Sequence, residues 1–232
     1  MLETLRPFAA DLAKTVDLVS VVLYGDALYP QTFRPHDPVR LLIVARVLDV
    51  EALTRIGAVV TAWRRRWNLD PVLFTPSELA ESLDVFPVEL SRARVAYAVV
   101  AGDDVMADLT IAPEHLRLQI EEDLRTKRLW LRQRILMLGG RPAKDVSAVA
   151  ESFSTLAPIL RAMLTWRGRP SVATAEGVLK EAVDALSLDA ALLETLQAVA
   201  RRQRRVSPDE APALLARYMA LLDTLVEMAQ RG

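Results

Sequence analysis

The densest group of cationic side chains is the run Arg201-Arg202-Gln203-Arg204-Arg205. Guanidinium groups bind phosphates and carboxylates through paired hydrogen bonds, so this arginine run could contact a phosphate or a protein partner. The run also comes directly before Ser207-Pro208, a pair that ends helices, and arginines are favoured at a helix C-terminus by the helix dipole. Both interpretations stay open from the sequence.

The residue types needed for several other chemistries are missing. The chain has no cysteine, which excludes disulfides, thiolate catalysis and cysteine–zinc sites, and its two histidines do not suffice for a histidine-rich metal site. The acidic groups Asp103-Asp104 and Glu121-Glu122-Asp123 fit a turn and a solvated helix better than a metal site. Glycine motifs of P-loop, dinucleotide-binding and hydrolase sites are absent. No catalytic residue can therefore be assigned from these groups.

The composition is that of a folded globular protein with little net charge. The 232 residues are 52% hydrophobic and 25% charged, with a net charge of −1, and suffice for one large domain or two small ones. A nearly neutral chain has no overall attraction to nucleic acid or to an acidic membrane. The sequence also lacks a membrane-spanning stretch and the pattern of a signal peptide. We therefore expect a cytoplasmic protein with neither nucleic acid nor membrane as a partner.

The first 112 residues alternate between strand and helix signals. Runs of β-branched residues predict strands at 18–24, 39–45, 71–75, 85–90 and 94–101. Apolar spacing predicts helices over 2–16 and from Asp49 to about Asn68, with a short helix after Thr75. The proline-rich segment 26–38 predicts a loop between the first two strands.

The remainder of the chain shows only helical signals. Helices are predicted at 114–138, 143–167, 171–186, 189–205 and 209–230. The predicted fold class is thus an α/β (α+β) N-terminal domain over 1–112, followed by an all-α helical bundle over 113–232. The residues expected to be buried in these elements are Leu23, Ile43, Val60, Val88, Val99, Leu124 and Leu131.

Two segments of the first domain together have the pattern of a known fold. They are Val22-Leu23-Tyr24-Gly25-Asp26-Ala27 and His36-Asp37-Pro38-Val39-Arg40-Leu41-Leu42-Ile43-Val44. A buried strand, a glycine turn and a second buried strand a dozen residues later resemble the nucleotidyltransferase fold. In that family, Gly-Ser after the first strand holds the triphosphate, and Asp-hydrophobic-Asp on the next strand binds magnesium. The resemblance implies a nucleotide site at Gly25, Asp26, Asp37, Arg40 and Glu89.

Two later segments extend the resemblance. Residues 84–90, which include Phe86-Pro87-Val88-Glu89, look like a Phe-Pro-hydrophobic-Glu strand of a bacterial subgroup of nucleotidyltransferase-domain proteins. Residues 114–125 look like the helix that follows in the same subgroup. The resemblance thus covers about residues 18–138.

The departures from the family pattern bear directly on activity. Gly25-Asp26 replaces Gly-Ser, which places a negative charge where the triphosphate binds in the family. The two metal-binding aspartates align with Pro38 and Arg40, and neither side chain can ligate magnesium. The resemblance therefore implies a pseudoenzyme without metal or cofactor. It would act as a binding, regulatory or scaffolding subunit, with a protein partner or by self-association.

Two alternatives remain at this stage. In the first, Asp26, Asp37 and Glu89 hold magnesium, and an active enzyme transfers a nucleoside monophosphate from a nucleoside triphosphate to a small molecule or a protein. In the second, the chain is an unrelated small α/β protein. The pseudoenzyme interpretation predicts an ion pair between Arg40 and Glu89, with Asp37 directed elsewhere.

Overall fold

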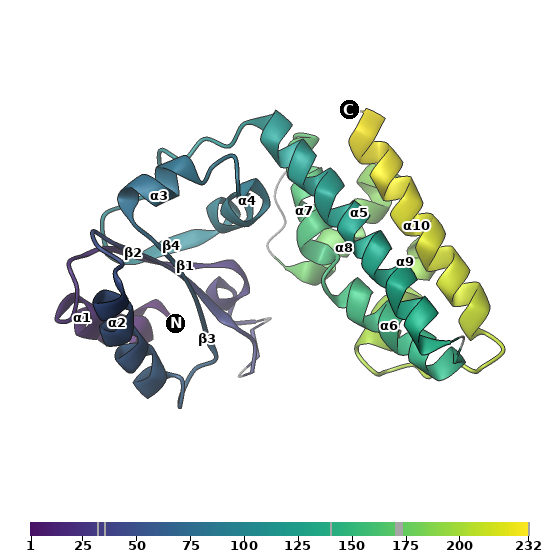
Figure 1. Cartoon of the computed structure of the whole chain (residues 1–232), viewed down its shortest axis with the longest axis horizontal. Helices are drawn as coiled ribbons and strands as arrows, with labels where there is room; N and C mark the ends of the chain where they lie inside the picture. The colour runs from purple at the N-terminus through teal and green to yellow at the C-terminus, as the bar shows by residue number, and fades with distance from the viewer. Residues whose placement is uncertain (32, 35, 140, 170–173, 232) are drawn as a thin grey trace. The chain divides into compact units, whose positions relative to one another are not determined.

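The computed structural model describes residues 1–31, 33–34, 36–139, 141–169 and 174–231 (Figure 1). The chain folds as two compact units, Met1–Ala112 and Pro113–Gly232, which are described separately below. Within the described residues, no helix combines the length and the apolar character needed to cross a membrane.

The first unit is built around a sheet of four strands. Its elements are α1 (Leu2–Ala13), β1 (Leu18–Tyr24), the 3₁₀ helix η1 (Gly25–Leu28), β2 (Val39–Ala45), α2 (Val50–Trp63), β3 (Leu69–Phe74), α3 (Pro76–Glu81), α4 (Pro87–Val95) and β4 (Tyr97–Gly102). The strand order is β3-β2-β1-β4. Strand β1 is antiparallel to both β2 and β4, whereas β2 and β3 run parallel and are connected through α2.

The central strands are covered on both faces, which explains why they are apolar at nearly every position. One face packs against α1 and α2, with Leu23 and Ile43 of the sheet in the same apolar cluster as Phe8 and Ile56. The opposite face carries Tyr24 and Leu42 and packs against residues of α3 and α4 (Figure 1). Successive side chains of a strand point to opposite faces, so Tyr24 and Leu23 belong to different layers.

Helix α2 begins where the sequence predicts. The Asp49 Oδ1 atom accepts a hydrogen bond from the Ala52 amide at 2.7 Å, which satisfies one of the free donors of the first turn. Thr75 caps α3 in the same way and forms a reciprocal capping box with Glu78. These two caps fix the helices that flank β3.

The strand predicted at 85–90 is wrong, because Pro87–Val95 forms helix α4. Pro87 occupies the first turn, where its missing N–H is not needed, and Glu89 and Arg94 lie at the helix ends that the dipole favours for their charges. The apolar residues of this segment therefore fit a short buried helix. The change moves Glu89 from a strand to the first turn of a helix.

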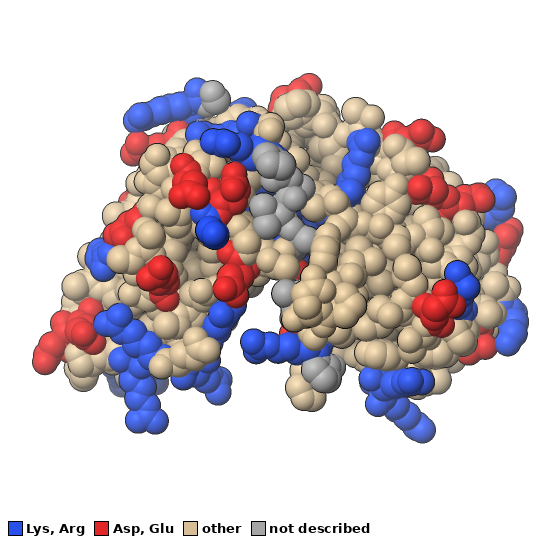
Figure 2. All heavy atoms as spheres, turned by 180° about the vertical axis from the view of Figure 1, so that it is seen from behind, with Lys and Arg blue, Asp and Glu red and all other residues tan. Residues whose placement is uncertain are grey.

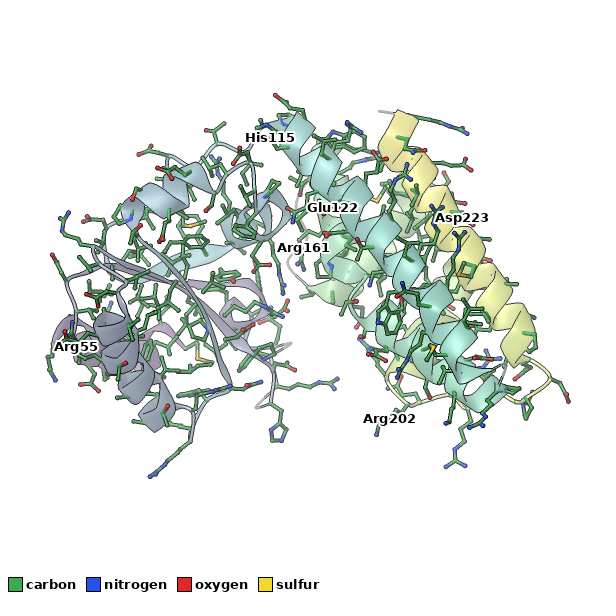
Figure 3. All side chains as sticks on the ribbon, in the orientation of Figure 1. Arg55, His115, Glu122, Arg161, Arg202 and Asp223 are labelled. Carbon is green, nitrogen blue, oxygen red and sulfur yellow. The ribbon has the colours of Figure 1, made fainter. Side chains whose placement is uncertain are left out.

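Every regular element of the second unit, within its described residues, is a helix. Its elements are α5 (Pro113–Leu138), α6 (Pro142–Ser154), α7 (Ala157–Trp166), α8 (Ala175–Leu186), α9 (Ala190–Ala200) and α10 (Ala211–Arg231). Helix α5 packs against α6, α7 and α10. Asp223 of α10 faces α5, and its Oδ1 atom lies 2.8 Å from Arg128 Nη1 (Figure 3).

The helix predicted over 143–167 is divided in two. Helix α6 ends at Ser154 and α7 begins at Ala157, with Pro158 in its first turn. A continuous helix would place Pro158 in its interior, where the ring removes a backbone donor and clashes with the preceding turn. Residues 171–173, which begin the next predicted helix, lie outside the described residues.

Most of the predicted core residues are buried. Leu23, Ile43, Val88, Leu124 and Leu131 are at most 7% exposed. Val60 and Val99 are only half-buried, so these two predictions are wrong. Val60 lies in α2, which presents one side to solvent. Val99 lies in β4, which pairs with only one strand and forms an edge of the sheet.

Candidate functional site

The site begins where the first two strands of the sheet meet at one end. In the antiparallel register, Tyr24 at the end of β1 lies opposite Arg40 near the start of β2. Gly25 follows with a φ of +77°, a conformation that favours glycine, and leads into η1, which carries Asp26. The backbone thus brings Tyr24, Asp26 and Arg40 together from two segments of the chain.

Two further elements complete this group of side chains. In the parallel register of β2 and β3, Arg40 lies beside Asp70. Helix α4 contributes Glu89 and Arg92, which are three residues apart and therefore share one side of the helix. We call these six residues the arginine–carboxylate cluster: Tyr24, Asp26, Arg40, Asp70, Glu89 and Arg92.

Asp26 lies between the two arginines of the cluster. Its Oδ2 atom is 3.6 Å from Arg40 Nη1 and 3.9 Å from Arg92 Nη2. Asp70 Oδ2 lies 3.7 Å from Arg40 Nε. All three distances are within ion-pair range but too long for a direct hydrogen bond. The carboxylates of Asp26 and Asp70 thus balance the positive charge of the arginines without forming the close, bidentate hydrogen bonds of an ideal pair.

Arg92 is the more deeply buried of the two arginines, with 11% of its side chain exposed. Its Nε atom is buried and has no hydrogen-bond partner within the described residues. Burial lowers the pKa of Arg92, and the nearby positive charge of Arg40 lowers it further. Two guanidinium groups therefore lie near the same carboxylate, and one of their donors, Arg92 Nε, has no hydrogen-bond partner within the described residues.

Glu89 has a different partner. The Tyr24 hydroxyl donates a hydrogen bond to Glu89 Oε1 at 2.7 Å. Burial raises the pKa of Tyr24, and the charge of Glu89 raises it further, so the hydroxyl is held as a donor. The ion pair predicted between Arg40 and Glu89 is wrong, because Arg40 pairs with Asp26 and Asp70 instead.

Of the residues predicted for the site, Gly25, Asp26, Arg40 and Glu89 come together and Asp37 does not. The Asp37 Oδ2 atom accepts a hydrogen bond from the backbone amide of Arg34 at 2.8 Å, within its own loop. The amide of Gly25 donates to the carbonyl of Ala96 at 3.1 Å. This amide is therefore already used within the fold.

The cluster does not fit a magnesium ion. The resemblance noted in the sequence would place metal ligands at Pro38 and Arg40, and Arg40 is directed into the cluster, where it pairs with Asp26. Its charge repels a divalent cation at the point where a ligand oxygen would be needed. Among the described residues, no three histidine, aspartate or glutamate side chains are grouped as a metal site.

Tyr24, Asp70 and Arg92 were not predicted from the sequence as site residues. For Arg92 the signal was available: Pro87 at the first helical position and acidic and basic residues at opposite ends indicate a helix, which would place Glu89 and Arg92 on one side. Asp70 and Tyr24 depend on strand register, which the sequence pattern alone does not give.

Two members of the second predicted site, Arg201 and Arg204, form ion pairs. Arg201 Nη2 lies 3.4 Å from Glu176 Oε2, and Arg204 Nη2 lies 3.6 Å from Glu210 Oε1. Arg204 also donates to Thr195 Oγ1 at 3.3 Å and lines a pocket open to solvent. These contacts tie the arginine run to α8, α9 and the start of α10.

The other two members, Arg202 and Arg205, are exposed, and within the described residues neither takes part in an ion pair. Arg202 follows the end of α9, with a φ of 58° (Figure 3). The face seen in Figure 2 carries basic and acidic side chains interspersed with broad areas of neither charge. As far as the structure describes the chain, two cations of the arginine run have no ion pair.

Comparison of the whole chain with known proteins identifies a similar fold. No family model matches the chain, and no curated protein matches it in sequence. A crystal structure of spectinomycin adenyltransferase AAD(9) from Enterococcus faecialis with ATP and spectinomycin is similar, with a TM-score of 0.59 and 10% sequence identity. The match covers 95% of this chain and 98% of that chain. The chain therefore has a nucleotidyltransferase-like N-terminal domain followed by a helical region.

Proposed function

We propose that this protein is a nucleotidyltransferase-fold protein that does not carry out magnesium-dependent nucleotidyl transfer. It would act by binding, as a regulatory or scaffolding subunit. The observation that supports this is Arg40, whose side chain is only 19% exposed and whose guanidinium group pairs with Asp26 and Asp70. A cation at this position takes the place of a ligand that two-metal chemistry requires.

The positions of the acidic side chains support the same proposal. The alternative of an active enzyme requires Asp37 to join Asp26 and Glu89 around magnesium. Asp37 instead accepts a hydrogen bond from Arg34 in its own loop, and Glu89 accepts one from Tyr24. For these three carboxylates to surround magnesium, Arg40 and Arg92 would also have to move away, because both lie beside Asp26.

The proposal is tested by incubating the full chain with magnesium and ATP labelled in the α-phosphate. Spectinomycin, which the similar structure contains, is the first acceptor to test, and the protein itself is the second. We expect no label on either acceptor above that of a heat-denatured sample. Magnesium-dependent labelling that is lost in Asp26→Asn and Glu89→Gln would establish the active enzyme instead.

A further inference from the structure

The arginine–carboxylate cluster leaves one cationic donor, the buried Nε atom of Arg92, without a hydrogen-bond acceptor within the described residues, and its ion pairs are long. Its three ion-pair distances, 3.6, 3.7 and 3.9 Å, exceed hydrogen-bond length, and the buried Nε atom of Arg92 has no partner within the described residues. Unsatisfied donors on buried guanidinium groups are costly, and a charged acceptor relieves that cost most strongly. The geometry therefore favours an additional anionic group beside Arg40 and Arg92.

The three carboxylates already present in the cluster differ in how they could respond to such a group. Glu89 is held by the Tyr24 hydroxyl at 2.7 Å. Asp70 is 58% exposed, so solvent screens its charge. Asp26 is the only carboxylate within ion-pair distance of both arginines in the described residues, and it lies on the short helix η1 directly after Gly25. It is the carboxylate that an incoming anion would replace.

We propose that Arg40 and Arg92 bind an oxyanion group of a ligand, a phosphate or a carboxylate, without a metal ion, and that Asp26 takes this position when the ligand is absent. This inference rests on the proposed function and names the chemical class of ligand for the same site. A phosphate or carboxylate offers several acceptor oxygens, whereas Asp26 reaches both arginines only at 3.6 and 3.9 Å. The planar donors of arginine match such groups in pairs.

The proposal predicts opposite effects for the acidic and the basic members of the cluster. Arg40→Gln and Arg92→Gln each remove a charged donor, which should weaken oxyanion binding about tenfold or more. Asp26→Asn removes the competing carboxylate and should strengthen binding. Arg46→Gln is the matched control, because Arg46 follows the other end of β2, is exposed and pairs with Asp17.

The test is isothermal titration calorimetry of the full chain in EDTA, with inorganic pyrophosphate in one series and succinate in another. We expect the wild type to bind one of these probes, which identifies a phosphate or a carboxylate ligand, with the order of affinity Asp26→Asn, wild type, Arg92→Gln. Arg92→Lys, which keeps the charge but loses the planar donors, should lie between the wild type and Arg92→Gln. Arg40→Gln and Asp26→Asn supply the comparison if Arg92→Gln does not fold.

The proposal is overturned if the wild type binds neither probe in EDTA, if Arg40→Gln and Arg92→Gln bind as the wild type does, or if binding requires magnesium. The first two results leave the proposed function unchanged, because a protein without metal-dependent transfer need not bind these anions. Magnesium-dependent labelling of an acceptor, by contrast, would overturn the proposed function.

Discussion

Tyr24 and Glu89 form the shortest polar contact within the arginine–carboxylate cluster. The Tyr24 hydroxyl donates a hydrogen bond to Glu89, a carboxylate that has no ion pair within the described residues, and this bond, together with the nearby charge of Arg92, compensates the partial burial of Glu89. Cross-strand neighbours also connect the contact to the sheet, because Tyr24 lies opposite both Arg40 and Tyr97. At the residue scale, the site is held by one hydrogen bond and several longer ion pairs.

Replacing Tyr24 by phenylalanine should lower the free energy of unfolding by about 1–3 kcal/mol, because it leaves a half-buried carboxylate without its donor. Tyr97→Phe is the matched control, since Tyr97 lies opposite Tyr24 but donates to the exposed Asp104 at 3.1 Å. Urea unfolding measures both. Equal losses in the two variants would show that the contact between Tyr24 and Glu89 has no special role.

Lys127 should make the free energy of unfolding depend on pH. Burial lowers the pKa of Lys127 to about 8, against the smaller opposing effect of Asp123. Between about pH 8 and pH 10 the unfolded chain therefore binds more protons at this site than the folded chain, so the contribution of Lys127 makes the free energy of unfolding rise with pH. The rise should be present in the wild type and in Lys14→Met, whose ammonium is exposed, and absent in Lys127→Met. A parallel pH profile for all three proteins contradicts this assignment.

At the scale of elements, the sequence predicts the sheet better than the site. The β-branched runs at 18–24 and 39–45 coincide with β1 and β2, because strands buried on both faces are apolar throughout. The segment 85–90, which contains Glu89, is largely apolar as well, and a short apolar run does not distinguish a strand from a buried helix. The helix start at Pro87 settles the question in favour of α4. Arg92 reaches the site only because that segment is a helix.

Replacement of glycine by alanine should change the free energy of unfolding in opposite directions at Gly102 and at Gly57. Gly102 ends β4 with a φ of +83°, and a Cβ atom there would lie 2.1 Å from the carbonyl oxygen of Val19 in β1. Gly102→Ala should therefore reduce the free energy of unfolding by at least about 1–2 kcal/mol. Gly57 lies inside α2 with no atom within 4 Å of such a Cβ, so Gly57→Ala should increase it by about 0.5–1 kcal/mol. Chemical denaturation of the two variants tests the close pairing of β1 with β4 at Gly102. A decrease of similar size in the free energy of unfolding of both variants would contradict it.

At the scale of the whole molecule, each unit has a core of its own. The two apolar clusters on the faces of the sheet consist of residues from the first unit. The second unit buries Tyr218 completely, with its hydroxyl 2.8 Å from Ser152 Oγ and its ring against Phe153. The change from mixed strand and helix signals to purely helical signals near Pro113 coincides with this division. The first core is built on a sheet covered by helices, and the second is built between helices.

Separate expression of residues 1–112 and 113–232 should give two folded proteins. The first should show a mixed helix and strand circular dichroism spectrum, and the second a helical spectrum, each with a cooperative thermal transition. The reason is that the cores just described are each assembled within one unit. A fragment that lacks a cooperative transition would show that its core depends on the other unit.

The proposed lack of magnesium-dependent transfer depends on Arg40 and Pro38, at the positions where the resemblance implies metal-binding carboxylates. Its most direct test is the thermal stability of the full chain with ATP, measured in magnesium and in EDTA, for the wild type and for the double variant Pro38→Asp with Arg40→Asp. A ligand at 100 times its dissociation constant adds about 2.7 kcal/mol to the free energy of unfolding. We predict that magnesium adds no stabilisation by ATP in the wild type and that it does so in the double variant. Magnesium-dependent stabilisation of the wild type by ATP would contradict the proposed function.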